Sequence, residues 1–240
     1  GHSSDIAKMG QTCFFQRARS RILSADVLVL NHSLFFSLLG DDGREDDEPD
    51  EGEGVLFKND FVILDEAHNI GPVASRHMGL SVSSGQVRFN LQRLWNPKTG
   101  KGLLGLLREA RATRSVEDAS AAMEQFFGEL EVACDELNEQ QAKASKFGGN
   151  ENRAWKELRV RSPDLIDDTL TLPLQRVREA LVQARDGTDD ADTRQELAEF
   201  NRRVCELREG VKLFLSQESD DHVYWVEKSG KANTILSLNA

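Results

Sequence analysis

Two kinds of hydrophobic pattern divide this chain of 240 residues. Near the N-terminus, short continuous apolar runs at Val27–Leu30 and Phe61–Leu64 are typical of strands buried on both faces of a parallel sheet. Beyond residue 79, apolar residues recur every three or four positions over long stretches, which is typical of amphipathic helices. We therefore expect a short α/β region followed by a mainly helical one.

In the first region the pattern predicts helices between and beside the two strands. They cover about 12–24, 32–39, and a stretch from residue 69 or 72 to 77. Strands that alternate with helices in this way belong to doubly wound α/β domains. Residues 1–78 supply only part of such a domain.

In the second region the strongest periodic signal runs from Val116 to Ala144. Ser115 and Asp118 resemble a capping box at its start, and Gly148-Gly149 would end it. Further helices are predicted from Ser84 to about 94, over 103–111, over 150–161, over 163–185 with a kink or restart at Pro173, and from 192 or 193 to 214. Long helices with narrow apolar seams favour an antiparallel bundle.

Strand-like segments accompany these helices. His222–Glu227 and Asn233–Leu238 are joined by Lys228-Ser229-Gly230-Lys231, which is a hairpin signal. Gly79–Ser83 alternates apolar and polar residues and could add a third strand. We expect a small β-sheet beside the bundle.

The net charge of −11 argues at first against a nucleic-acid partner. However, nine acids and one arginine lie between Asp41 and Gly54, so this segment carries −8 and all the rest only −3. We interpret the segment as a solvated insert whose charges repel one another. A role in steering or mimicking DNA is the alternative.

The cysteines and the apolar runs bear on the compartment. Cys13, Cys134 and Cys205 lie far apart, with neither a disulfide framework nor zinc spacing, and fit a reducing cytoplasm. The apolar stretch from residue 25 to 40 is interrupted by Asn31-His32-Ser33, so we expect no membrane span. The start Gly1-His2 is typical of a tag remnant, and we expect a piece of a longer protein.

Asp65-Glu66 follows the second predicted strand directly. Ligands of open α/β sheets bind beyond the carboxyl ends of the strands, where adjacent carboxylates can hold a divalent cation and act on a water molecule. In nucleotide hydrolases the first acid positions Mg²⁺ and the second polarises the attacking water. The competing interpretation is a solvated strand end or the start of a helix.

Three strings in this order resemble a known family. Phe61–His68 contains the DEAH form of the second motif of superfamily 2 helicases, and Ala25–Leu34 resembles the strand that precedes it in their DinG/XPD branch. Cys13, followed by Phe14-Phe15 and Arg17-Ala18-Arg19, resembles the last cysteine of the iron–sulphur region of that branch. The resemblance covers about the first third of the chain.

This resemblance implies a fold and an activity. Residues 1–78 would be part of a RecA-like helicase motor domain, and residues 79–240 would be the inserted helical domain called the arch, with a small sheet at its root. The longer protein would be an ATP-dependent DNA helicase that couples hydrolysis of Mg-ATP to translocation on single-stranded DNA, in the 5′ to 3′ direction. Protein partners of the helical domain are also expected.

The resemblance also implies roles for single residues. Asp65 would coordinate Mg²⁺, Glu66 would orient and deprotonate the attacking water, and His68 would couple the nucleotide site to a second motor domain and to the nucleic acid. Cys13 would be one ligand of a [4Fe–4S] cluster, which needs four thiolates, so this chain alone should hold none. Some relatives of the DinG type lack the cluster altogether.

Two groups of basic residues could contact nucleic-acid phosphates. The first is Arg17, Arg19 and Arg21, and the second is Arg153, Lys156, Arg159 and Arg161. For both groups an ordinary solvated helix face is the alternative.

The sequence has no G-x-x-x-x-G-K-[ST] string to cradle nucleotide phosphates. The nearest string, Pro97–Gly102, has the wrong spacing, follows Trp95 rather than a strand, and predicts a turn. In the family the phosphate loop lies upstream of the cysteine region, so we expect negligible ATP hydrolysis by this chain alone.

Two other classes of protein stay open. A helical interaction module without enzymatic activity could use the heptad-like seams to bind a partner helix. A metal-dependent nuclease would use Asp65-Glu66, but further spaced acids or histidines to complete a two-metal site are lacking.

Overall fold

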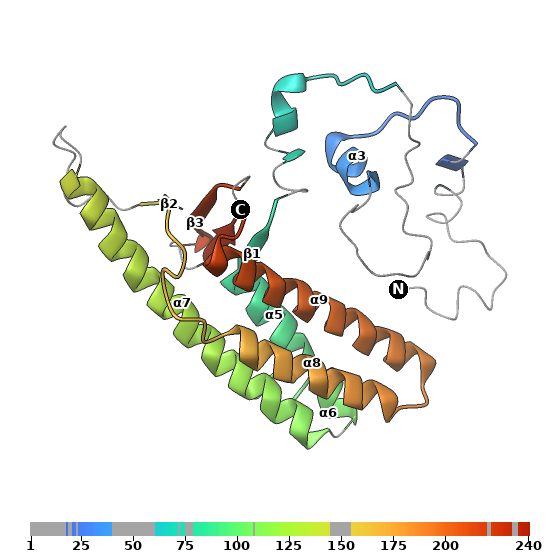
Figure 1. Cartoon of the computed structure of the whole chain (residues 1–240). Coiled ribbons are helices and arrows are strands. Elements are labelled where there is room, and N and C mark those ends of the chain that lie inside the picture. The colour runs from blue at the N-terminus through green and yellow to red at the C-terminus, as the bar shows by residue number, and fades with distance from the viewer. Residues whose placement is uncertain are drawn as a thin grey trace. The chain divides into compact units, whose positions relative to one another are not determined.

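The computed structural model describes residues 18, 21–22, 24–39, 61–71, 73–74, 79–107, 109–144, 155–219, 222–231 and 235–240. The chain divides into two compact units, Gly1–Gly79 and Leu80–Ala240 (Figure 1). Each unit has its own local structure.

The first unit contains the helix α3, His32–Leu38, and the single turn η1, Ala67–Asn69. Asn31 precedes α3 with an extended backbone, and its side-chain oxygen accepts a hydrogen bond of 2.7 Å from the N–H of Leu34. This satisfies one of the N–H groups that a helix start leaves unpaired. The helix predicted over 32–39 is confirmed.

The prediction of two buried strands in this unit is wrong. Val27–Leu30 and Phe61–Leu64 form no strand, and Val29 is 95% exposed while Phe61 is fully exposed. A strand is stable only when a neighbour pairs its backbone N–H and C=O groups. None of the described residues of this unit supplies such a neighbour.

Several predictions fall on residues outside the described ones. Of the helix predicted over 12–24, the structure shows helical backbone at Ala18, Arg21 and Ile22. Cys13, Arg17, Arg19 and the acidic segment 41–54 lie outside the described residues, as do parts of the helix predicted up to residue 77.

The second unit is built on four helices. They are α5 (Ser84–Leu94), α7 (Ala110–Ala144), α8 (Thr171–Asp186) and α9 (Ala191–Ser216). Contacts join α5 to α7, α7 to α8, α8 to α9 and α9 back to α5, so the four form a closed bundle (Figure 1). A short helix, α6 (Leu103–Leu107), packs on α5 and α7. The helical bundle predicted for this region is present.

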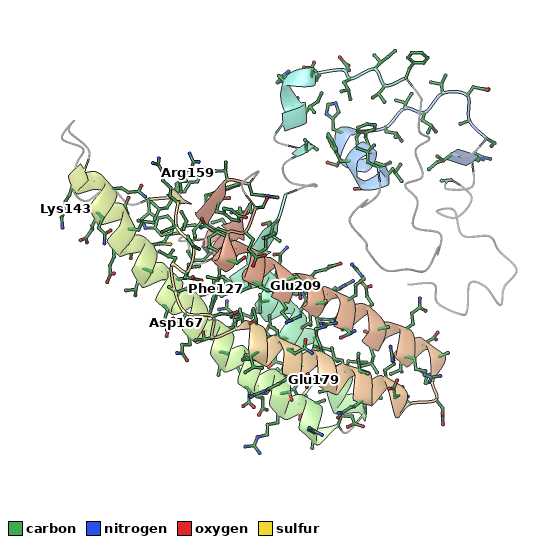
Figure 2. All side chains as sticks on the ribbon, in the orientation of Figure 1. Phe127, Lys143, Arg159, Asp167, Glu179 and Glu209 are labelled. Carbon is green, nitrogen blue, oxygen red and sulfur yellow. The ribbon has the colours of Figure 1, made fainter. Side chains whose placement is uncertain are left out.

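The bundle interior is filled by the predicted apolar seams, and Figure 2 shows side chains crowding the space between the helices. On α7 the buried positions recur every three or four residues: Val116, Ala119, Met123, Phe126 and Leu130. On α9 they are Leu197, Phe200, Val204, Leu207, Val211 and Phe214. Burial of such side chains is the dominant favourable contribution to folding.

Two helix starts differ from the prediction. The capping residue of α5 is Ser83 rather than Ser84, and Ser83 forms a reciprocal capping box with Gln86. Helix α7 begins at Ala110, so Ser115 lies inside it and donates its hydroxyl to the carbonyl of Arg111 at 3.2 Å. A hydroxyl bonded to the preceding turn is compatible with a helix interior, and a capping pattern therefore does not by itself set a helix start.

Helix α8, in contrast, starts later than predicted, at Thr171. Pro173 occupies the third helical position, where its missing N–H has no partner within the helix in any case, so the chain needs no kink. Asp168 instead accepts hydrogen bonds from the N–H groups of Leu170 and Thr171, at 3.2 and 2.9 Å. Residues 163–170 are not helical.

A four-stranded antiparallel sheet completes the second unit. Its strands are β1 (Ser81–Ser83), β2 (Glu157–Val160), β3 (Tyr224–Ser229) and β4 (Ile235–Asn239), in the order β1-β4-β3-β2. One face lies against α5 and α9, where Val82, Leu158, Val226 and Leu238 are buried. The predicted hairpin and third strand are confirmed.

The helix predicted over 150–161 is wrong, because residues 157–160 form β2. Leu158 and Val160 are buried and Glu157 and Arg159 are exposed, which is the alternation of a strand. Pairing with β3, in which Leu158 lies opposite Val226, determines this structure from a distant part of the chain.

A largely buried lysine links the sheet to α7. The side chain of Lys228 on β3 is 13% exposed, and its Nζ lies 3.0 Å from Glu131 and 3.3 Å from Asp135. The same ammonium lies 4.2 Å from the ring centre of Trp155, whose Nε1 donates to Asp135 at 2.7 Å. These contacts fix the start of the β2 segment against the helix.

The two ends of the second unit are paired. Leu80 donates to the carbonyl of Ala240 at 2.8 Å, and Ala240 donates to the carbonyl of Leu80 at 3.0 Å. These bonds continue the β1–β4 ladder, so Leu80 and Ala240 lie side by side.

Among the described residues, no helix is both long enough and apolar enough to span a bilayer.

Candidate functional site

The predicted catalytic acids lie in an exposed turn of the first unit. The carboxylate of Asp65 accepts a hydrogen bond of 2.9 Å from the N–H of Glu66. Glu66 has a left-handed backbone, with φ 47° and ψ 47°, and directly precedes η1. Non-glycine residues adopt this conformation rarely, and such outliers concentrate at functional sites. The turn projects both carboxylates into solvent.

His68 lies beside the second acid. Its Nδ1 is 3.3 Å from Oε2 of Glu66, and both side chains are mostly exposed. An exposed pair of this kind contributes little to stability. The contact does, however, place the imidazole directly beside the Glu66 carboxylate.

The structure brings together two of the three strings that carry the family resemblance. Nε2 of His32, at the start of α3, lies 3.0 Å from the main-chain carbonyl of Asp65, although 33 residues separate the two. Asn31, the neighbour of His32, caps the same helix. Sequence reasoning assigned no role to His32. Its place two residues after a predicted strand end, in an Asn-His pair, was the available signal.

The donor set at this turn suits a hard cation. Magnesium prefers oxygen ligands and is usually bound through one or two carboxylates, with waters and substrate phosphates completing its shell. Asp65 and Glu66 supply adjacent exposed carboxylates of this type. Among the described residues no group of three or more His, Cys, Asp or Glu side chains converges into a complete protein cage. The chemistry of the two acids therefore fits a magnesium ion.

The other predicted site residues are placed only in part. Arg21 is exposed on helical backbone, while Arg17, Arg19 and Cys13 lie outside the described residues. Cys134 is buried in α7, where desolvation raises its pKa to about 12, so this thiol is part of the core.

The string that comes nearest to a phosphate loop is a turn, as predicted. Residues 97–100 form turns closed by a bridge between Asn96 and Lys101. Gly100 and Gly102 have positive φ, and a Cβ on Gly102 would lie 2.4 Å from the carbonyl oxygen of Leu94. Gly102 serves the close approach of the turn to the end of α5, whereas Gly100 provides a left-handed residue within the turn.

The chain is 36% identical over 76 residues to the ATP-dependent DNA helicase YoaA of Haemophilus influenzae. It resembles part of a DNA helicase. The match covers 31% of this chain and 11% of that protein. The Escherichia coli YoaA helicase is also 36% identical, over 80 residues, or 33% of this chain and 12% of the relative. The predicted resemblance to a helicase is confirmed, and its assignment to the DinG/XPD branch stays a prediction.

No model of a protein family matches the chain, and no solved structure matches it. The matched part of the chain spans only 11–12% of the length of the two YoaA helicases.

Proposed function

We propose that this chain is part of an ATP-dependent DNA helicase. The observation that carries the proposal is the similarity of about a third of the chain to two YoaA helicases. The DEAH string at Asp65–His68 supports it, as does the hydrogen bond that places His32 against the carbonyl of Asp65. The substrates proposed for the longer protein are ATP and single-stranded DNA, with translocation from 5′ to 3′.

In this proposal the two acids divide the work of hydrolysis. Asp65 would hold Mg²⁺, which supplies charge neutralisation at the nucleotide phosphates when bound. Glu66 would orient a water molecule and accept its proton as the water attacks. The N–H of Glu66 already fixes one oxygen of Asp65, leaving the other oxygen available as a ligand.

The histidines would connect this site to movements elsewhere in the motor. Because His68 contacts the Glu66 carboxylate, a displacement of the imidazole would change how Glu66 faces the water. His32 would transmit a shift of the segment after Val27–Leu30 to the main chain of Asp65. Both are positioning roles.

For the second unit we propose the arch-like role that the resemblance implies. The rival role, in which the bundle seams bind an external helix, is less well supported. The α7 and α9 seam residues are buried within the unit itself, Val116, Phe126 and Val204 being fully buried. A protein partner would have to use another surface.

The iron–sulphur cluster stays a proposal for the longer protein that rests on the sequence around Cys13 alone. Cys134 and Cys205 lie in helices α7 and α9, and Cys134 is buried. The cytoplasmic location is likewise a prediction.

The decisive experiment measures ATP hydrolysis stimulated by single-stranded DNA in the longer protein that contains this chain. Glu66→Gln should lower the rate by about a hundredfold or more while nucleotide binding persists, because the proton acceptor is lost but the cation ligand is kept. Glu218→Gln, which removes an exposed acid of the second unit, is the matched control. Full activity in Glu66→Gln would contradict the proposal, and so would robust hydrolysis by the present chain alone.

A further inference from the structure

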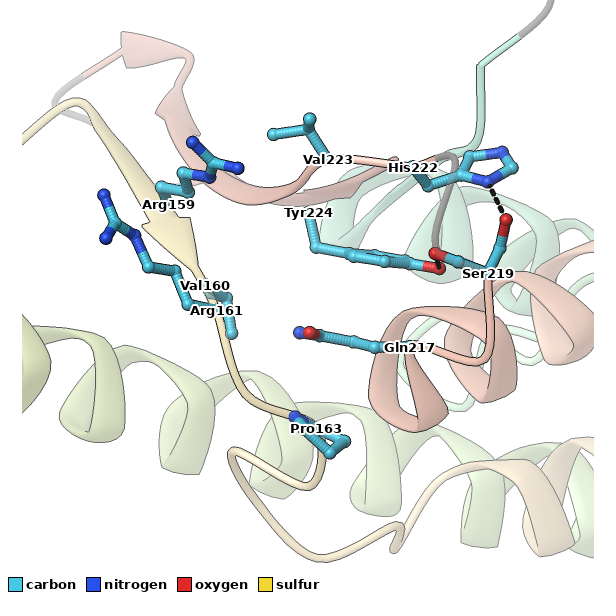
Figure 3. A pocket seen from close by; sticks show the side chains of 9 residues that line it. All are labelled: Arg159, Val160, Arg161, Pro163, Gln217, Ser219, His222, Val223 and Tyr224. Carbon is cyan, nitrogen blue, oxygen red and sulfur yellow. Dashed lines mark hydrogen bonds between the residues drawn. The ribbon is translucent and has the colours of Figure 1, made fainter.

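An open hollow of about 480 Å³ lies at the end of the sheet, between the β2 edge and the link from α9 to β3 (Figure 3). Arg159 and Arg161 line it from one side, and Gln217, Ser219 and Tyr224 from the other. The hollow belongs wholly to the second unit. It uses none of the residues assigned above to ATP hydrolysis.

Two positive charges face one side of this hollow. Arg159 and Arg161 are two residues apart on extended backbone, so their side chains leave the strand on the same side, opposite the buried Val160. Figure 3 shows both guanidinium groups on that side. Both arginines are exposed.

These two arginines differ from many others in the unit in their ion pairing. Arg88, Arg185, Arg202, Arg203 and Arg208 each form an ion pair with a carboxylate. Neither Arg159 nor Arg161 pairs with any acid among the described residues. Two unpaired guanidinium groups at one concave place form a ready recognition element for an oxyanion.

A polar group on the opposite wall also lacks a partner. Nε2 of Gln217 is buried, and it has no hydrogen-bond partner among the described residues. Figure 3 shows its side-chain amide reaching into the hollow. Buried donors without acceptors are rare in native proteins, and each calls for an explanation, such as a water, an ion or a ligand.

The backbone places this amide at an energetic cost. Gln217 ends α9 in the left-handed conformation, with φ 48° and ψ 39°, at a position where helices usually carry glycine or asparagine. Its N–H bonds the carbonyl of Leu213 at 3.0 Å, so the helix end itself is satisfied. The helix end therefore accounts for the left-handed backbone, and only the unpaired amide of Gln217 is left without an explanation inside the protein.

We propose that this hollow is a binding site for a phosphate group, held by Arg159, Arg161 and the side-chain amide of Gln217. A phosphate carries enough negative charge to match two guanidinium groups, and its tetrahedral oxygens can accept hydrogen bonds from both walls at once. The group can come from a free phosphate or from the backbone of a single-stranded nucleic acid. Because Asp65 and Glu66 take no part in this site, the phosphate proposal can be tested independently of the helicase proposal.

The test titrates the full chain at constant ionic strength with inorganic phosphate and, separately, with a short oligothymidylate that lacks terminal phosphates. Side-chain NMR signals of the arginine Nε–H and glutamine amide groups report binding. We expect saturable shifts of the Arg159, Arg161 and Gln217 signals with at least one of the two probes.

Variants make the result specific. Arg159→Gln combined with Arg161→Gln should weaken binding by about a hundredfold, because two charge-assisted contacts are lost. Gln217→Ala should weaken it by about fivefold, because one neutral donor is lost. The matched control, Arg176→Gln with Arg194→Gln, removes the same charge from exposed positions of α8 and α9 and should leave affinity within about twofold, as expected for distant charges in salt.

The two probes separate the sources of the phosphate. Shifts with inorganic phosphate alone assign a free phosphate, and tighter binding of the oligothymidylate that phosphate competes away assigns a nucleic-acid backbone. The proposal is overturned if neither probe gives saturable shifts, or if the arginine double variant binds as tightly as the control.

Asp220 and Asp221, which precede His222 in the sequence, lie outside the described residues. Binding that appears only after Asp220→Asn and Asp221→Asn would also overturn it, since the arginines would then be engaged by these acids.

Discussion

The two units of this chain treat apolar side chains in opposite ways. In the first unit Phe61 and Val29 are exposed beside the most recognisable strings of the sequence. In the second unit Phe126, Leu130 and Val204 are fully buried, and none of the helices carries a motif. Residues that identify a family by their chemistry and residues that hold a fold together are here found in different parts of the chain.

The largest expected effect on stability is tested by comparing substitutions of two phenylalanines. Phe126→Ala should lower the free energy of unfolding by about 3–5 kcal/mol, because it opens a cavity in the bundle. Phe61→Ala, at a fully exposed side chain, should change it by less than about 0.5 kcal/mol. Urea unfolding followed by tryptophan fluorescence gives both values. Similar losses in the two variants would mean that Phe61 is buried in solution.

The second prediction concerns the link from β3 to α7. Lys228→Met should cost about 1–2 kcal/mol at neutral pH, because the ammonium loses two carboxylate partners and its position over Trp155. Lys212→Met, at an exposed lysine of α9, is the control and should be nearly neutral.

The same link should depend on pH. Burial disfavours the charge on Lys228, but hydrogen bonds to Glu131 and Asp135 outweigh this, and its pKa is raised above the ordinary 10.5. Its contribution to stability is therefore present in full below pH 10.5 and is lost as the pH rises through the higher folded value. The difference between the wild type and Lys228→Met should shrink in that alkaline range. A difference that stays constant would contradict the charge-based explanation.

Two helical glycines offer a matched pair. A Cβ on Gly210 of α9 would lie 2.4 Å from Cγ2 of the buried Val82, whereas a Cβ on Gly128 of α7 would meet nothing within 4 Å. Gly210→Ala should lose about 1 kcal/mol net, since overpacking outweighs the gain in helix propensity. Gly128→Ala should gain about 0.5–1 kcal/mol. Thermal unfolding of both variants tests this. A gain in both would mean that α9 and β1 leave room for a methyl group at Gly210.

The smallest expected effect on stability concerns the helix caps, which differ between the two units. Side-chain and backbone hydrogen bonds from Thr193 lower the pKa of Asp190, the capping residue of α9, below its ordinary 3.8. The cap should stabilise the second unit above that pH and fade as the pH falls through the lowered value. Asn31 caps α3 in the first unit without a charge, so its effect should not follow pH.

Urea midpoints of the wild type and Asp190→Ala, measured from neutral to strongly acidic pH, should converge at the acidic end. Asp190→Asn should keep the cap and remove this pH dependence. Curves for the wild type and Asp190→Ala that stay parallel would contradict the role of the carboxylate.

The helices were predictable where the spacing of apolar residues repeated over many turns, as in α7 and α9. The hairpin was predictable because Ser229-Gly230 separates two strand-like runs. Strand β2 was not, because its four residues are too few to show a period and Trp155 and Leu158 are three apart, as in a helix. Pairing with β3, far away in sequence, determines its structure.

The candidate sites show the same division. The acids Asp65 and Glu66 could be chosen from their string, while the contact of His32 with the carbonyl of Asp65 depends on a fold that brings distant residues together. The hollow at Arg159 was out of reach for another reason. A helix at residues 150–161 would have spread the basic side chains around its axis, and only the strand puts Arg159 and Arg161 on one side, opposite Gln217.

The pairing of Leu80 with Ala240 has a mechanical consequence. Both residues lie at the same end of the antiparallel β1–β4 ladder, so a force that pulls them apart acts on the outermost hydrogen bonds first. The ladder would then open one bond at a time, as in unzipping, rather than resist with all its bonds together, as in shear. Under such a force the β1–β4 ladder would therefore be the first part of this unit to open.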